Sequence, residues 1–166
     1  MFPVSHGFSC LMCGWCCQHL VSSGWSGLSL FPWEKHLFPR DRVLPHLGYG
    51  ASPEDPGFRV FLYRYTDPAC VHLAGGRCSI HGDRPLVCRS YPFRHVRRGE
   101  SGFFYEAAPE CKAVNPAAGP AKAERFSELY AAEEIGMHLE AFYRKERKWE
   151  RDAVSGAWML LRMGKA

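Results

Sequence analysis

The sequence has no run of 18 or more apolar residues, so no segment is long enough to span a membrane as a helix. It begins Met1-Phe-Pro-Val-Ser-His6 and lacks the basic stretch followed by an apolar stretch that opens a secretory signal. We therefore expect a cytoplasmic protein without membrane contact. In that reducing compartment, eight cysteines are typical of metal ligands or redox groups rather than structural disulfides.

Common catalytic motifs are also missing. The chain has no glycine-rich cradle of the P-loop or dinucleotide type, no C-x-x-x-C-x-x-C spacing of radical S-adenosylmethionine enzymes, no H-E-x-x-H and no G-x-S-x-G. The sequence therefore identifies no catalytic residue. A nucleophilic cysteine stays open, because a Cys–His pair is assembled only by the fold, and so does the question of whether the protein is an enzyme.

Charge of one sign is not in large excess, since Lys and Arg outnumber Asp and Glu by 21 to 17. The resulting +4 assumes neutral thiols, and eight metal-bound thiolates would change it to 4 − 8 = −4 before the metal is counted. The basic run at 144–151 alternates with acidic residues, which favours a solvated helix face over an RNA- or membrane-binding patch. We expect no nucleic acid partner.

The middle of the chain is punctuated by proline and glycine, with short apolar runs between them. Residues 58–65 are β-branched and aromatic and predict a strand. Residues 94–105 predict a hairpin. Residues 32–37 and 84–91 each contain an early proline and predict short helices.

The residues after Pro120 contain no proline up to 163 and are rich in helix-forming residues, which predicts a helix with a possible break at Gly156. Its apolar stripe consists of Ala131, Ile135, Leu139, Phe142, Trp149, Ala153 and Leu160. We expect an α+β fold in two parts separated by a Pro- and Gly-containing linker. They are a small, irregular cysteine-cluster metal-binding domain over 1–116 and a C-terminal helical segment over 117–166 packed on it. A dimer interface is the alternative use of the stripe.

The strongest signal is Cys10-Leu-Met-Cys13-Gly-Trp-Cys16-Cys17, in which two C-x-x-C steps overlap. This spacing lets two sulfurs converge on one ion across a tight turn. Gly14 suits that turn, because backbone N–H groups must face the sulfurs and glycine tolerates positive φ. The side chains of adjacent Cys16 and Cys17 diverge, so one of the pair is expected to serve a different centre or none.

Four further cysteines are spread along the chain, namely Cys70, Cys78, Cys88 and Cys111. The eight cysteines form two groups of four, which could fill two four-coordinate metal sites or one site with a redox pair left over. The alternative for Cys111 is that it acts only as a small buried hydrophobic residue. Thiolate ligation suits zinc or an iron–sulfur cluster. A dry shell that favours the cluster is indicated by nearby aromatic residues: Phe8, Trp15, Trp25, Phe31, Trp33, Tyr91 and Phe93.

Charged residues near the cysteines are candidate partners of the cofactor. Arg84 and Arg89 flank Cys88, and a guanidinium there neutralises an anionic thiolate centre or, alternatively, pairs with an ordinary carboxylate. Three histidines lie within three residues of a cysteine: His19, His72 and His81. Each is a candidate ligand or hydrogen-bond partner, with a surface or capping role as the alternative.

Three separated segments together resemble the YkgJ-like cysteine-cluster family, which carries a C-x-x-C-x-x-C-C signature and is described as a zinc- or iron-chelating domain. The segments are Phe8-Ser-Cys-Leu-Met-Cys-Gly-Trp-Cys-Cys17, Gly76-Arg-Cys-Ser-Ile-His81 and Arg84-Pro-Leu-Val-Cys-Arg-Ser-Tyr-Pro-Phe93. His81 departs from the family pattern, which usually has Tyr there. The resemblance implies metal-ligand roles for Cys10, Cys13, Cys16, Cys17, Cys70, Cys78 and Cys88, with Cys111 as a weaker extension.

The cysteine cluster is also similar to that of flagellin lysine-N-methylases, which implies a [4Fe–4S] centre and S-adenosylmethionine as methyl donor. Three hypotheses follow. The first is an oxygen-sensitive protein with one or two [4Fe–4S] clusters in a redox or protein-modification role, in which His81 could complete an open iron site. The second is a Zn²⁺-binding structural or protein-interaction module. The third is an S-adenosylmethionine-dependent protein lysine methyltransferase or a component of one. The expected partner is a protein substrate or redox partner, and the sequence does not indicate an oligomeric state.

Overall fold

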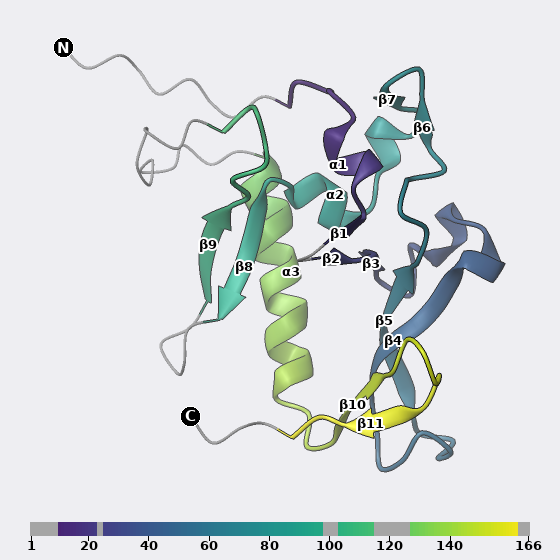
Figure 1. The fold of residues 1–166 in the computed structure, drawn as a ribbon. Helices are drawn as coiled ribbons and strands as arrows, with labels where there is room; N and C mark the ends of the chain where they lie inside the picture. The colour runs from purple at the N-terminus through teal and green to yellow at the C-terminus, as the bar shows by residue number, and fades with distance from the viewer. Residues whose placement is uncertain (1–9, 23–24, 98–102, 115–126, 163–166) are drawn as a thin grey trace. The chain divides into compact units, whose positions relative to one another are not determined.

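The computed structural model describes residues 10–22, 25–97, 103–114 and 127–162, and it has the expected α+β architecture of antiparallel strands and few helices (Figure 1). The chain forms two compact units. The cysteine unit comprises residues 1–18 and 72–136, and the sheet unit comprises residues 19–71 and 137–166. No helix of the described residues has the length and apolar character needed to cross a membrane. The predicted division at 116 falls outside the described residues and stays a prediction.

The cysteine unit is built from short elements. In chain order they are α1 (Trp15–Gln18), β6 (Leu73–Ala74), β7 (Arg77–Cys78), the 3-10 helix η3 (His81–Asp83), α2 (Leu86–Ser90), β8 (Phe93–Arg97), β9 (Phe103–Ala107) and the first part of α3 (Ser127–Tyr143). Strand β6 pairs with β7, and β8 pairs with β9, both antiparallel. The predicted hairpin over 94–105 is therefore confirmed. The helix expected over 84–91 is α2, which ends at Ser90 because Tyr91 precedes a proline and is extended.

The sheet unit contains a five-stranded antiparallel sheet in the order β11-β10-β4-β5-β3 (Figure 1). Its elements are β1 (Val21–Ser22), β2 (Trp25–Ser26), β3 (Leu28–Leu30), the 3-10 helices η1 (Lys35–Leu37) and η2 (Arg40–Arg42), β4 (Val43–Tyr49), β5 (Arg59–Tyr65), the end of α3, β10 (Lys148–Arg151) and β11 (Trp158–Leu160). The predicted strand at 58–65 is confirmed as β5. The helix expected over 32–37 is only the single 3-10 turn η1.

An aromatic core joins α3 to this sheet. Phe142 on α3 stacks on Phe61 of β5 with ring centroids 4.4 Å apart, and Phe31 meets Phe61 edge-on at 5.7 Å. Phe31 and Phe142 are each 1% exposed. Parallel-displaced and edge-to-face rings combine large apolar burial with favourable ring electrostatics, so this contact fixes the end of α3 against the sheet.

The helix predicted across residues 121–163 is wrong beyond Tyr143. There the Lys148 ammonium, itself buried, donates hydrogen bonds to the carbonyls of Tyr143 and Lys145 and so closes the helix end. Trp149 lies on β10 opposite Gly48, and a turn with Gly156 at φ 70° leads into β11. Pairing with β4, which is distant in sequence, overrides the helical spacing of the apolar residues.

Candidate metal centre

The first C-x-x-C step forms a turn in which the backbone faces sulfur. The Met12 N–H donates to Cys10 Sγ at 3.4 Å, and Met12 itself has φ 49°. Gly14 has φ 71°, and a Cβ there would lie 2.7 Å from the Gly76 carbonyl oxygen. The predicted need for glycine is therefore confirmed on both grounds. Backbone N–H groups that face sulfur are the donors that a metal-bound thiolate needs.

The cysteine pair lies on the single turn of α1. Cys17 and Gln18 donate their N–H groups to the Gly14 carbonyl at 3.1 and 3.2 Å. A hydrogen bond from the Cys17 thiol, assisted by the Arg84 charge, lowers the pKa of Cys16 to about 7 against the opposing effect of burial. The two thiols therefore differ in role within this structure, since Cys17 is the donor to Cys16.

The β6–β7 hairpin carries Cys78 on its second strand. Its two-residue turn is Gly75-Gly76, with φ 55° and 77°, and Leu73 pairs with Cys78. A tight hairpin turn of this kind needs positive φ at both central positions, which glycine supplies without strain. The carbonyl of Gly76 against Gly14 brings this hairpin onto the N-terminal cysteine turn.

Tyr91 is influenced by cysteines that are distant in the sequence. Burial raises the pKa of the Tyr91 hydroxyl, and Cys111, Cys16 and Cys13 add to that effect. Burial likewise raises the pKa of Cys111, and Cys10 and Cys13 act on it in the same direction. The thiols of Cys13, Cys16 and Cys111 are thus within electrostatic range of Tyr91, and those of Cys10 and Cys13 are within range of Cys111. The sequence predicted Tyr91 only as one of the aromatic residues near the cysteines. Its position just after the helix that carries Cys88 was a signal that it lies near the thiols.

The predicted ligand and the two arginines in and just before helix α2 differ in exposure. Cys88 is half-buried in the middle of the helix, whereas Arg89 is exposed. Arg84, just before the helix, donates from Nη1 to His81 Nε2 at 2.8 Å, and its Nε is a buried donor without a hydrogen-bond partner among the described residues. Burial and the Arg84 charge lower the pKa of His81. Of the three predicted cofactor-binding residues, Arg84 and His81 therefore come together, and the role of Arg89 stays a prediction.

Some candidates belong to the sheet unit. Cys70 lies there, near Tyr65, whose pKa is raised to about 12 mainly by burial and by Asp67. His19 is also in this unit and is exposed, while His72 is in the cysteine unit and half-buried. Phe31 and Trp33, expected in a shell around the cysteines, stack on each other in the sheet unit at 4.8 Å.

All eight cysteines are thiols, and each of them lies in the described part of the chain. Seven are half-buried and Cys13 is exposed. Within the described residues, no three His, Cys, Asp or Glu side chains are arranged as a ready-made site for one ion. The thiol-rich donor set suits zinc or iron, the orphaned Arg84 donor suits an anion beside it, and the ligand assignment of each cysteine stays a prediction.

Residues 9–112 match a family model, CxxCxxCC, described as a "putative zinc- or iron-chelating domain". The chain belongs to the CxxCxxCC family. The match spans both the N-terminal cysteine run and Cys111, so it covers well over half of the chain. Membership supports metal binding and a zinc or iron cofactor. No curated protein and no solved structure matches the chain.

Proposed function

We propose that this CxxCxxCC protein holds one or two [4Fe–4S] clusters and has a redox or protein-modification role. The observation that carries the proposal is the gathering of seven cysteines in one compact unit, with Cys10, Cys13, Cys16 and Cys111 all within electrostatic range of Tyr91 or of one another. Seven thiols exceed the four that one tetrahedral zinc takes. They suffice for one cluster and leave thiols over for a second centre or a redox pair.

The local electrostatics support a thiolate centre in this unit. Four thiolates carry more negative charge than a zinc ion or an oxidised four-iron cluster neutralises, so the centre is an anion that needs nearby donors. The Met12 N–H on Cys10 and the Arg84 guanidinium, whose charge acts on Cys16, are such donors. The cluster, when bound, would supply electron transfer or Lewis acidity, and these residues would hold and shield its thiolates.

A structural Zn²⁺ site is the second candidate, and a specific feature favours it. The buried apolar side chains described in the cysteine unit are few and small, consisting of Leu86, Pro85, Pro92 and the alanines Ala108, Ala131 and Ala132. A unit with so little apolar burial gains much of its stability from a metal, and zinc supplies that without redox chemistry. In that case the protein would be an interaction module.

The deciding experiment measures iron, sulfide and zinc together with the visible spectrum of anaerobically purified protein. The proposal expects about four or eight irons with matching sulfide per chain and broad visible absorption that bleaches in air. One or two zincs without iron would replace the proposal with the zinc module. Protein without either metal, purified at normal yield, would overturn both.

Serine variants test the ligands. We expect Cys13→Ser and Cys88→Ser each to weaken metal affinity. The loss should exceed the roughly 10- to 100-fold that follows when a hydrogen-bond partner of a ligand is removed. Ser79→Ala, an exposed neighbour of Cys78, is the matched control and should keep its metal. Cys70→Ser asks whether the sheet unit contributes a ligand, as the family resemblance implies. Full metal content in Cys70→Ser would confine the centre to the cysteine unit.

The modification role has its own test. Calorimetric titration of the loaded protein with S-adenosylmethionine should show saturable binding if the chain is a lysine methyltransferase or part of one. Absence of binding, with the cluster present, would leave electron transfer to a protein partner as the proposed role.

A further inference from the structure

Arg84 holds a donor that the described residues do not satisfy. Its Nε is fully buried and has no hydrogen-bond partner among them. A buried, unsatisfied donor on a permanently charged group is costly, and native proteins rarely leave one without an ion or ligand to accept it. The Nε–H therefore points to an acceptor that is bound in the working protein.

The other end of the guanidinium is fixed by His81. Arg84 Nη1 is 2.8 Å from His81 Nε2. Because arginine has no acceptor and does not lose its proton, Nε2 must be the accepting nitrogen, and the proton of the neutral imidazole lies on Nδ1. His81 thus orients the planar guanidinium, which in turn sets the direction of Nε–H.

The cysteine helix α1 lies in the same unit as Arg84 and offers sulfur acceptors. The Arg84 charge acts on the Cys16 thiol of this helix. Glu128, a buried carboxylate of the same unit, acts on His81, but Arg84 Nε has no hydrogen-bond partner among the described residues. A sulfur on the Cys16 side is therefore the acceptor that fits the free Nε–H.

We propose that Arg84 is a positioning residue of the metal centre: its Nε–H donates to a sulfur of the centre that includes Cys16, and His81 holds the guanidinium for that contact. This inference rests on the proposed function. It also changes the role of His81, because a nitrogen that accepts from Arg84 is not available to complete an open iron site. His81 is an orienting residue and not a ligand through Nε2.

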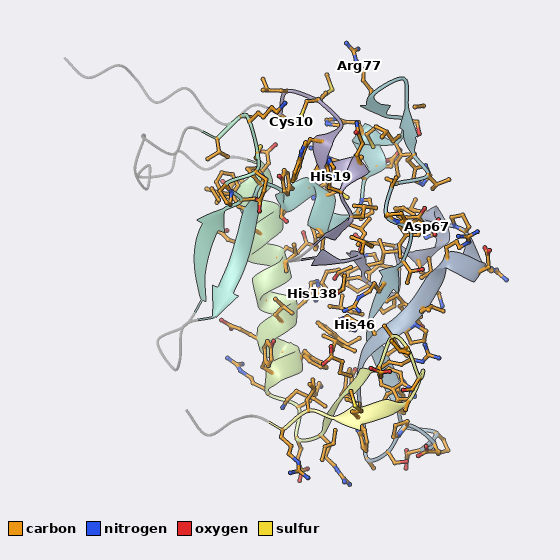
Figure 2. All side chains as sticks on the ribbon, viewed as in Figure 1. Cys10, His19, His46, Asp67, Arg77 and His138 are labelled. Atoms are coloured by element: carbon orange, nitrogen blue, oxygen red, sulfur yellow. The ribbon has the colours of Figure 1, made fainter. Side chains whose placement is uncertain are left out.

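The test follows metal loss from anaerobically purified, metal-loaded protein in excess chelator, by metal analysis and by the visible or ultraviolet charge-transfer band. Arg84→Gln should weaken metal retention by about 10- to 100-fold and shift the band. Arg84→Lys should restore little of it, because an ammonium lacks the fixed fork. The control is Arg77→Gln, an exposed arginine of the same unit that points away from it (Figure 2), which should match wild type.

His81 separates positioning from simple packing. His81→Gln keeps an acceptor for Arg84 and should retain metal nearly as wild type does, whereas His81→Leu should lose it faster. Wild-type protein that holds metal while Arg84→Gln and Arg84→Lys both behave like Arg77→Gln would overturn the inference and leave the proposed function intact. Wild-type protein that holds no metal would overturn both. If Arg84→Gln is insoluble, metal retention in Arg84→Lys and in the two His81 variants tests the inference instead.

Discussion

The two units of this protein are stabilised differently. The sheet unit buries large apolar side chains, namely Leu20, Leu28, Leu30, Phe31, Phe38, Leu62, Tyr65 and Phe142. The described part of the cysteine unit buries one leucine, two prolines and three alanines, and its seven thiols are half-buried or exposed. Because apolar burial scales with the area removed from water, the described residues of the sheet unit supply more hydrophobic stabilisation than those of the cysteine unit. We therefore predict that metal binding and folding are coupled in the cysteine unit.

Metal removal should have the largest effect, and it should destabilise the cysteine unit but not the sheet unit. We expect chelation to cost the cysteine unit much of the roughly 10–16 kcal/mol that structural metal sites contribute, so that its amides lose protection from hydrogen exchange. Amides of β4 and β5 should keep theirs, because their sheet does not depend on the metal. Anaerobic hydrogen exchange with mass spectrometry, before and after chelation, measures both. Equal loss of protection in the two units would contradict the interpretation.

A core substitution in the sheet unit should lower the free energy of unfolding without changing the metal content. Phe142→Ala removes the ring that stacks on Phe61 and should lower the free energy of unfolding by about 3–5 kcal/mol. Metal per folded chain should not change. Urea unfolding followed by tryptophan fluorescence gives the first quantity, with Val154→Ala, 97% exposed, as the control. A loss no larger than the control's would show that this aromatic core contributes little.

Acid should act on the sheet unit through His46. Burial, together with the Arg64 charge, lowers the pKa of His46 from 6.5 to about 4. The Glu150 Oε1 atom lies 3.9 Å from His46 Nδ1. The unfolded chain therefore binds the proton more readily, and stability present above pH 6.5 falls as the pH decreases towards 4, by about 3 kcal/mol at most. His46→Gln should flatten this dependence in pH-resolved urea unfolding. The exposed His36→Gln is the control, and a slope unchanged in His46→Gln would refute the assignment.

The smallest effect concerns the β6–β7 turn. Gly76→Ala places a side chain at φ 77° and should cost about 1–2 kcal/mol of stability in the metal-loaded protein. Gly82→Ala is a matched control in the same unit, because it has open space and no positive φ. Thermal unfolding of both variants side by side measures the difference. Identical melting temperatures would mean that the hairpin turn does not support the cysteine unit.

Local signals in the sequence predicted the local structure well. The β-branched run at 58–65 became β5, the 94–105 segment became the β8–β9 hairpin, and the proline-bounded segment around Cys88 became α2. The requirement for Gly14 was also visible, since a C-x-x-C turn needs backbone N–H groups facing sulfur. The continued helix after Tyr143 failed, because Trp149 and Leu160 have helical spacing but pair with each other across β10 and β11.

By itself, the sequence determined that this is an α+β metal-binding protein of the cysteine-cluster kind, because cysteine spacing and glycine placement act over a few residues. Only the tertiary structure decided that N-terminal cysteines act electrostatically on Tyr91 and Cys111, that Arg84 binds His81 while Arg89 faces solvent, and that the chain's end completes a sheet. These contacts join residues far apart in the chain. Their free energy depends on burial and on strand pairing, which no local pattern encodes.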